Sequence, residues 1–394
     1  MIETKLGRIA ILGVPIDDLS MEDAVQRIDQ LIERGGFHQV ATANVDFLMN
    51  SMDDQELMDI LHRCEIVLAD GMPLVWASRI MGTPLTQRIT GADLLPHLIK
   101  LSQSKKRRMF LLGATEDRSR AAAEWIERTY PGAQLAGRYS PPFCALEELD
   151  HDHIIDLIEQ AGVDILLVAF GNPKQEKWLA MHRNRLRVPV CIGVGASIDF
   201  LSGQHPRAPN WMQHAGLEWL HRFIIEPRRL GGRYARNAFG VLLYLSQQVF
   251  AISMQSRSSN PFRLSLVDKS NALVFDVTGE LTGAALQEFR DLLKRSVVGD
   301  RAVILNLTGT TYVGADGLGI LLDLSSRLRD RGQELWLVGL RVGLQRLFRT
   351  AFIHRRLFRI APTVAEALRR IELKVHDTEP QGILGRYFRE EASR

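Results

Sequence analysis

Short apolar runs that end in glycine or aspartate recur through the first two thirds of the chain, and a helix-like pattern follows each run. The runs include IVLAD at 66–70, MFLLG at 109–113, ILLVAFG at 165–171 and VCIGVG at 190–195. Strands of a parallel sheet give such runs because helices bury both faces of the sheet. The alternation therefore predicts an α/β fold with a mostly parallel sheet, and it places polar residues together at the carboxyl edge of that sheet.

The chain of 394 residues is long for a single core, so more than one domain is expected. Residues 9–14 predict a first strand, and Pro15–Leu19 predict a turn. A polar segment, MQSRSSNPF, interrupts the pattern at 254–262, and a second strand–helix alternation follows it. We expect an α/β domain at 1–253 with a basic helical appendage at 208–253, a linker at 254–261, a smaller α/β domain at 262–375 and a polar tail at 376–394.

Composition narrows the class of protein. The formal net charge is +3, which gives no global signal for nucleic acid. The three cysteines have neither metal-ligand nor redox spacing, so we expect reduced, structural thiols in a reducing compartment. No uninterrupted apolar run reaches the ~20 residues that span a bilayer, and the N-terminus lacks a signal pattern. These features predict a cytoplasmic protein.

Asp70 and Gly71 end one of the buried runs and form the first candidate for chemistry. About twenty residues later, Arg88, Gly91 and Asp93 stand at the start of another helix-like pattern. A carboxylate at a strand tip with an arginine nearby suits an anionic, hydroxyl-rich substrate, and the carboxylate can act as a general base. The same carboxylate can instead cap the following helix, whose second residue is proline. The residues alone leave both roles open.

Other strand tips carry polar residues that could line the same crevice. HQVATAN ends with Thr42 and Asn44, and FGNPKQEKW follows a buried run directly. A glycine after a strand lets the backbone approach a ligand, and amide side chains can bind a sugar or a base. The alternative is an ordinary strand–helix turn. Neither a P-loop nor a complete dinucleotide fingerprint is present. The candidates for substrate binding in the second motif are Gly171, Asn172, Gln175 and Glu176.

Two further groups have more than one interpretation. Arginines gather between Arg222 and Arg236, where they could neutralise a diphosphate, attract anionic lipid head groups or form a solvated helix face. The sequence DHDH at 150–153 contains an Asp-x-Asp pair that some metal-dependent sugar transferases use. It stands before a helix-like pattern with no apolar strand ahead of it, so we expect helix-capping residues and no metal or other cofactor.

Seven motifs together resemble the WecG/TagA/CpsF family of bacterial glycosyltransferases over residues 8–250. They are TANVDF, ADGMPLVWASR, QRITGADLL, FLLGA, VAFGNPKQEKW, GVGASIDFLSG and EWLHRFIIEPRRLGGRY. The resemblance implies a Rossmann-like, mostly parallel sheet domain with a helical C-terminal appendage. It implies transfer of an N-acetylhexosamine from UDP-N-acetylmannosamine or its uronic acid to an undecaprenyl diphosphate-linked acceptor, with inversion and without a metal.

The same resemblance assigns roles to individual residues. The family's proposed base matches Asp70, its threonine and asparagine match Thr42 and Asn44, and its arginine and glutamine match Arg88 and Gln175. The family's appendage carries arginines that close over the diphosphate and helps to hold the enzyme at the inner face of the cell membrane. The residues in the corresponding stretch are Arg228, Arg229 and Arg233.

Residues 262–374 resemble a STAS domain, the module of anti-sigma-factor antagonists. The motifs are VFDVTGELTG, VILNLTGTTYVGADGLGIL and ELWLVGL. Regulatory members have the loop Asp-Ser-Ser-Gly-Leu-Gly and a phosphorylated serine, whereas here Asp316 stands in a loop without serine. Asp316 can supply a fixed negative charge, or the domain can be a docking surface for a protein partner. An alternative function is therefore a regulatory scaffold with an inactive transferase-like domain.

Overall fold

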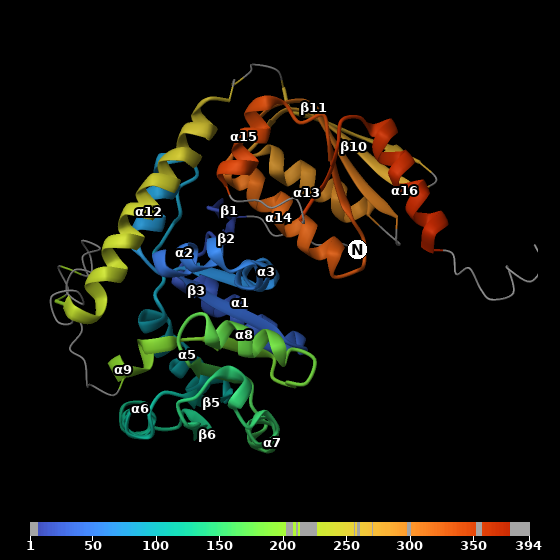
Figure 1. Ribbon diagram of the computed structural model, residues 1–394. Helices are drawn as coiled ribbons and strands as arrows, with labels where there is room; N and C mark the ends of the chain where they lie inside the picture. Colours follow the sequence, from blue (N-terminus) through green and yellow to red (C-terminus); the bar gives the residue numbers. More distant parts are fainter. Residues whose placement is uncertain are drawn as a thin grey trace, which may run out of the picture.

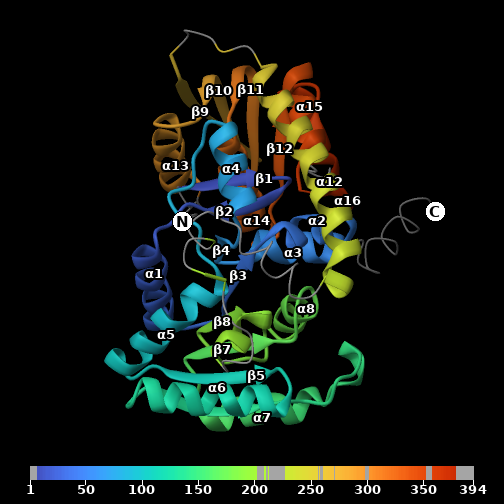
Figure 2. The same ribbon diagram turned by 90° about the vertical axis from the view of Figure 1, so that its left-hand side faces the viewer.

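The computed structural model describes residues 7–201, 208–209, 212, 227–255, 257, 261–269, 271–297, 301–351 and 357–378. Side chains at 227–239 and 374–378 lie outside this description. Two α/β units are present, here called the N-terminal domain (β1 to α12) and the C-terminal domain (β9 to α16). Figures 1 and 2 show that the units lie one on the other and that α12 (Pro227–Ser253) runs along both.

A six-stranded parallel sheet forms the centre of the N-terminal domain. Its strand order is β4-β3-β8-β7-β5-β6, so all carboxyl ends of the strands meet at one edge. This confirms the predicted α/β fold. The strands are β3 (His38–Ala43), β4 (Ile66–Ala69), β5 (Arg108–Gly113), β6 (Gln134–Tyr139), β7 (Ile165–Ala169) and β8 (Val190–Gly193).

Helices cover both faces of this sheet and begin at recognisable caps. Ser20 and Asp23 form a capping box at the start of α1, and Thr90 accepts from the Asp93 N–H at the start of α5. The helices are α1 (Met21–Arg34), α2 (Val45–Asp53), α3 (Gln55–Arg63), α4 (Met72–Ile80), α5 (Gly91–Lys105), α6 (Glu116–Thr129), α7 (His151–Ala161), α8 (Lys174–Met181) and α9 (Ile198–Leu201).

The first strand predicted at 9–14 is wrong, because the chain forms a hairpin there. β1 (Arg8–Ile11) pairs antiparallel with β2 (Val14–Asp17) in a separate two-stranded sheet. The turn residues Leu12 and Gly13 have φ values of 48° and 81°. Two consecutive residues in the left-handed region make the tight hairpin turn that matches strand twist, and leucine rarely adopts this conformation.

The C-terminal domain is a five-stranded sheet with the order β13-β12-β11-β10-β9, in which only β9 is antiparallel to its neighbour. One face packs on α16, and the other packs on α13, α14 and α15. The elements are β9 (Arg263–Asp268), β10 (Ala272–Leu281), α13 (Ala285–Ser296), β11 (Ala302–Val313), α14 (Ala315–Arg329), β12 (Leu335–Val338), α15 (Val342–Thr350), β13 (Arg359–Ala361) and α16 (Val364–Thr378).

Helix α12 is fastened to both domains by two buried glutamines seven residues apart. The Gln248 amide accepts from the Leu12 N–H (2.8 Å) and donates to the Ala10 carbonyl (2.9 Å) on the open side of β1. Just beyond the helix end, the Gln255 amide accepts from the Val313 N–H (2.9 Å) and donates back to the carbonyl of that residue (3.1 Å). Seven residues are close to two helical turns, so one face of the helix carries both amides.

Candidate active site

Asp70 extends from the tip of β4, the strand at one side of the six-stranded sheet. Its backbone N–H donates to the Ala43 carbonyl (2.8 Å), which fixes the residue beside the end of β3. Helix α4 begins after Gly71, whose φ of 156° favours glycine, and no side chain caps it. The N-cap position of α4 is therefore Gly71, the residue after Asp70. Its carboxylate is half-buried at the edge where the strands end.

The segment before α5 returns to the same strand tip. The Ile89 N–H donates to the Ala69 carbonyl (2.9 Å), so Arg88 is held near the end of β4. An Arg88 Nη2 atom lies 3.5 Å from Asp93 Oδ2, and the Thr90 hydroxyl donates to the same oxygen (2.8 Å). Asp93 thus orients both the arginine and the helix start. This places a partly buried guanidinium beside the sheet edge that carries Asp70.

Thr42, Gly91 and Ser197 come together from three separate elements. A Cβ atom added at Gly91 would lie 2.7 Å from Ser197 Oγ and 3.6 Å from Thr42 Oγ1. Gly91 therefore permits the start of α5 to approach the ends of β3 and β8. Asn44 caps α2, since its side-chain oxygen accepts from the Phe47 N–H (3.1 Å). These contacts confirm that the strand tips gather, but they do not test the assigned chemical roles.

Sequence analysis missed two polar residues after β8. Ser197 lies against Gly91, and Asp199 is buried and forms an ion pair with Arg118 (3.1 Å). Both residues belong to GVGASIDFLSG, which attracted attention through its glycines. The available signal was the pair of polar residues that follows those glycines after a buried strand.

Gln175 joins the turns after β7 and β8. Its Oε1 atom accepts from the Gly171 and Gly195 N–H groups, each at 3.1 Å, and its Nε2 atom donates to Glu176 Oε1 (2.7 Å). Only 2% of Gln175 is exposed. The amide is therefore engaged within the protein and holds two glycine turns in register.

Glu176 extends this network into the core. Asn172 Nδ2 donates to Glu176 Oε2 (3.0 Å), and Asn50 Nδ2 donates to Asn172 Oδ1 (2.7 Å). Burial raises the pKa of Glu176 to about 7, against the hydrogen bonds from Gln175 and Asn172 that lower it. The four residues form a buried polar chain from α2 to the turn after β7, and Gly171 provides the turn with a φ of 81°.

The DHDH residues have structural roles. Asp150 caps α7 by accepting from the His153 N–H (3.1 Å), and Asp152 pairs with Arg185 (2.5 Å). The His151 ring packs against the His182 ring and accepts from the Trp178 N–H (3.2 Å). Capping was therefore the correct interpretation for Asp150. In the portion of the chain with described coordinates, no cluster of three or more His, Cys, Asp or Glu side chains has an arrangement for a metal ion.

The arginines predicted to meet diphosphate belong to α12. The backbone of Arg228, Arg229 and Arg233 is helical, but their side chains lie outside the described residues. The structure therefore does not place their guanidinium groups relative to the strand tips.

The family model described as "Glycosyl transferase WecG/TagA/CpsF family" matches residues 9–254. The chain belongs to this family. A curated relative from Staphylococcus aureus (strain MRSA252), an N-acetylglucosaminyldiphosphoundecaprenol N-acetyl-beta-D-mannosaminyltransferase, is 28% identical over 227 residues. The match covers 57% of this chain and 87% of the relative. The protein from strain MW2 has the same name and is 27% identical over the same length.

The C-terminal domain is a STAS domain, with a family match over residues 263–367. An anti-sigma factor antagonist from Mycobacterium paratuberculosis is 18% identical, with a TM-score of 0.27, over 30% of this chain and 99% of that one. SpoIIAA in its unphosphorylated form is 19% identical, with a TM-score of 0.23, over 28% of this chain and 98% of that one.

The loop that distinguishes this STAS domain is closed by its own carboxylate. Asp316 accepts from the Thr282 hydroxyl (2.8 Å) and from the Gly283 and Gly317 N–H groups, each at 2.8 Å. The negative charge therefore joins the turn after β10 to the first turn of α14. None of the helices in the described residues has the length and hydropathy to span a bilayer.

Proposed function

We propose that this family member is an inverting glycosyltransferase of bacterial surface polysaccharide biosynthesis. It transfers an N-acetylhexosamine, with N-acetylmannosamine or its uronic acid as the first candidates, from a UDP-sugar to a lipid diphosphate-linked acceptor. The names of the staphylococcal relatives support this choice of sugar and acceptor. The observation that most supports catalysis is the position of Asp70, a half-buried residue at the tip of β4 beside the ends of the neighbouring strands.

In the proposed reaction, Asp70 takes the proton from an acceptor hydroxyl while that oxygen attacks the anomeric carbon of the donor. The new glycosidic bond forms on the face opposite the departing UDP, and the bond from the anomeric carbon to the diphosphate breaks. Arg88 stabilises the negative charge that develops on the leaving group, together with N–H groups at the start of α5. Thr42 and Asn44 line the sugar site, and the arginines at 228, 229 and 233 close over the diphosphate.

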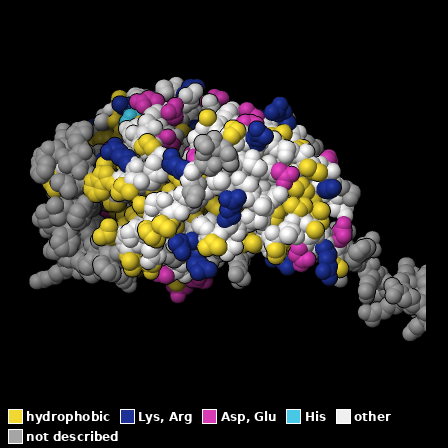
Figure 3. Space-filling view, turned by 90° about the horizontal axis from the view of Figure 1, so that it is seen from above, with side chains coloured by type: hydrophobic (Ala, Val, Ile, Leu, Met, Phe, Trp, Pro, Cys, Tyr) yellow, Lys and Arg dark blue, Asp and Glu magenta, His cyan; other side chains and the backbone are white. Residues whose placement is uncertain are grey.

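We assign the membrane contact to the outer side of α12. Leu242, Leu243, Phe250 and Met254 are exposed and fall within about a third of the helix circumference. Val241, Gln248 and Ile252 are buried on the opposite side. Figure 3 shows hydrophobic side chains gathered where α12 lies. An apolar stripe beside a basic segment suits peripheral attachment to the inner membrane surface. Sedimentation with anionic vesicles tests this, because Phe250→Ser should bind less.

The decisive experiment measures UDP release from UDP-N-acetylmannosamine with a synthetic lipid-diphosphate-linked N-acetylglucosamine acceptor. Asp70→Asn should lower kcat roughly 10²–10⁴-fold with donor binding nearly unchanged. Asp53→Asn is the matched control, because that exposed carboxylate lies at the end of α2. Full activity in Asp70→Asn would remove Asp70 as the base. A folded protein that releases no UDP with this or related donors would favour the regulatory scaffold instead.

A further inference from the structure

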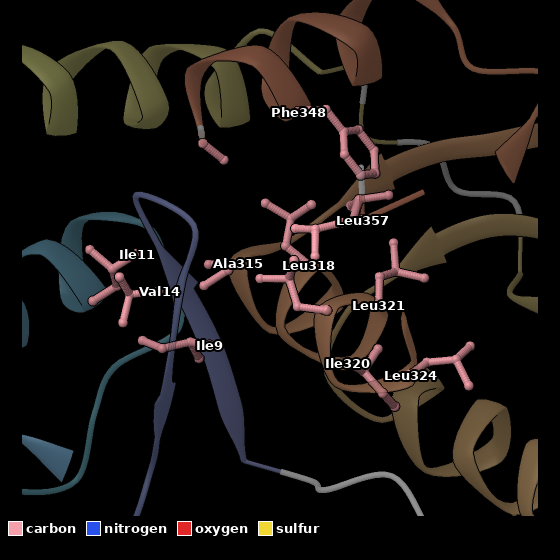
Figure 4. Close-up of a cluster of buried hydrophobic side chains, with 14 of the residues drawn as sticks. Ile9, Ile11, Val14, Ala315, Leu318, Ile320, Leu321, Leu324, Phe348 and Leu357 are labelled. Carbon is pink, nitrogen blue, oxygen red and sulfur yellow. The ribbon is translucent and has the colours of Figure 1, made fainter. Parts of the chain in front are cut away.

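The STAS domain packs directly on the hairpin of the N-terminal domain. Ile9, Ile11 and Val14 of the hairpin and Ala315 and Leu318 of α14 belong to one continuous hydrophobic core, and the hairpin lies beside the start of α14 (Figure 4). A Cβ atom added at Gly319 would lie 2.1 Å from the Arg8 carbonyl oxygen. Only glycine therefore permits this approach of the α14 backbone to β1. The apolar face of α14 is committed to its own chain.

A buried ionic cluster crosses this contact. The Arg8 guanidinium is fully buried and donates to both Asp17 carboxylate oxygens (3.0 and 2.6 Å). Its third nitrogen lies 3.5 Å from Asp323 of α14, and Arg327 donates to the other oxygen of that carboxylate (2.9 Å). Burial lowers the pKa of Arg8, but attraction to Asp17 and Asp323 outweighs that effect and raises it. The charge therefore stays, and removing one partner leaves it undercompensated.

The cluster continues into the strand that carries Asp70. Asp17 Oδ2 accepts from the Val67 N–H (2.7 Å), three residues before Asp70. Arg8 Nη2 also lies 3.3 Å from the carbonyl oxygens of Cys64 and Glu65, just before β4. β4 has only four residues and is hydrogen-bonded to a single neighbouring strand, β3, within its sheet. Its outer edge is therefore positioned by the hairpin, and the hairpin is held by α14.

We propose that Asp323 is a positioning residue for the transferase, acting through Arg8, Asp17 and Val67 on the placement of Asp70. The partner of this face of the STAS domain is then the hairpin of the same chain, and the domain serves as an internal brace for the site. The inference rests on the proposed base role of Asp70. Its physical basis is that a misplacement of about 1 Å can cost on the order of 10²-fold in rate.

The test compares Asp323→Asn with Asp330→Asn in the UDP-release assay. Asp323→Asn keeps the side-chain shape but removes the charge, and it should lower kcat about 10-fold with KM for the donor unchanged. Asp330 is the control, because it follows α14 and pairs with Arg63 at the end of α3 (3.8 Å), while both side chains are nearly half exposed. Unchanged kcat in a folded Asp323→Asn protein would overturn the proposal.

A double variant separates positioning from general loss of structure. If Asp323 acts through Asp70, Asp323→Asn should cause no further loss in the Asp70→Asn background. An equal loss in both backgrounds would overturn the proposal in favour of a purely structural role. Arg327→Gln removes the more exposed of the two arginines that contact the Asp323 carboxylate. It should lower kcat by a smaller factor at unchanged KM, and it keeps the test decisive if Asp323→Asn does not fold.

The same set of variants distinguishes the two proposals. Full activity of Asp70→Asn would contradict the base role itself. An inactive Asp70→Asn together with fully active Asp323→Asn and Arg327→Gln would leave the base role in place and overturn only the brace.

Discussion

The turns after β4 and β7 lie at the same edge of one sheet, yet their polar side chains differ in burial and in hydrogen bonding. After β4, Asp70 is half-buried beside the end of β3. After β7, Gln175 and Glu176 are almost fully buried and satisfy one another and two glycine N–H groups. In the proposed mechanism the first turn supplies the base, whereas the side chains of the second turn hold the segments after β7 and β8 together.

The largest expected effect concerns Arg88 on the β4 side. Arg88→Ala should lower kcat on the order of 10²-fold, because in the proposed mechanism the guanidinium stabilises the departing diphosphate. The free energy of unfolding should change little, since the ion pair with Asp93 is long at 3.5 Å. Steady-state kinetics and urea unfolding check both parts. Arg79→Ala on the exposed end of α4 is the control. An equal fall in kcat in Arg88→Ala and Arg79→Ala would contradict a specific role for Arg88 in the reaction.

On the β7 side, Gln175→Ala should act mainly on stability. The Gly171 and Gly195 N–H groups would lose their acceptor, at a cost of about 3 kcal/mol in the free energy of unfolding. Urea unfolding measures this, with Gln103→Ala as control, because the half-buried Gln103 donates a single hydrogen bond to the Pro131 carbonyl. Unchanged stability with a raised KM for the donor would instead make Gln175 a substrate contact, the role that family resemblance assigns.

Glu176, in the segment after β7, should make the free energy of unfolding depend on pH. Burial raises its folded pKa from 4.5 to about 7, so between these values the folded state holds a proton that the unfolded chain has released. Stability therefore falls as the pH rises through this window, by on the order of 3 kcal/mol. Glu176→Gln should lack this component.

Unfolding free energies of both proteins at pH 5 and pH 8 test the Glu176 prediction. Burial lowers the pKa values of His62 and His182 to about 4, and these groups work in the opposite direction below pH 6.5. They are common to both proteins and cancel in the difference between them. Identical pH profiles for wild type and Glu176→Gln would contradict a protonated Glu176.

The smallest effect is expected at Asn44. Asn44→Ala removes the side-chain cap of α2 and should cost about 1 kcal/mol in the free energy of unfolding. Thermal unfolding measures the loss, and Asp54→Ala at the start of α3 provides a second cap for comparison. Asn44 also lines the proposed sugar site, so the KM for the donor should rise as well, and unchanged stability would contradict the capping role.

Local sequence was sufficient where strands are buried and helices have clear caps. The runs before Asp70 and Gly171 became β4 and β7, and Ser20 with Asp23 forms a capping box that begins α1. The hairpin was missed because Leu12 adopts a left-handed conformation that a propensity argument assigns to glycine or asparagine.

Contacts between segments that are distant in the sequence could not be predicted from local sequence patterns. Spacing identified Gln175 as polar at a strand tip, but only the fold shows its oxygen between Gly171 and Gly195. The sequence of α14 does contain a pattern that predicts a long-range contact, because apolar residues lie on nearly every side of this helix. Such a helix is buried all round, which the sheet of one small domain cannot provide.

Gln248 of α12 and Gln255 just after it affect the strand edges through which two molecules of this chain could pair. The outer edge of β1 and the free end of β11 present N–H and carbonyl groups in the geometry that another strand would recognise. Gln248 and Gln255 occupy those groups with side-chain amides of the same polypeptide. Gln248 of α12 and Gln255 just after it thereby cover two places where strand exchange between molecules could begin, by the same contacts that join the two domains.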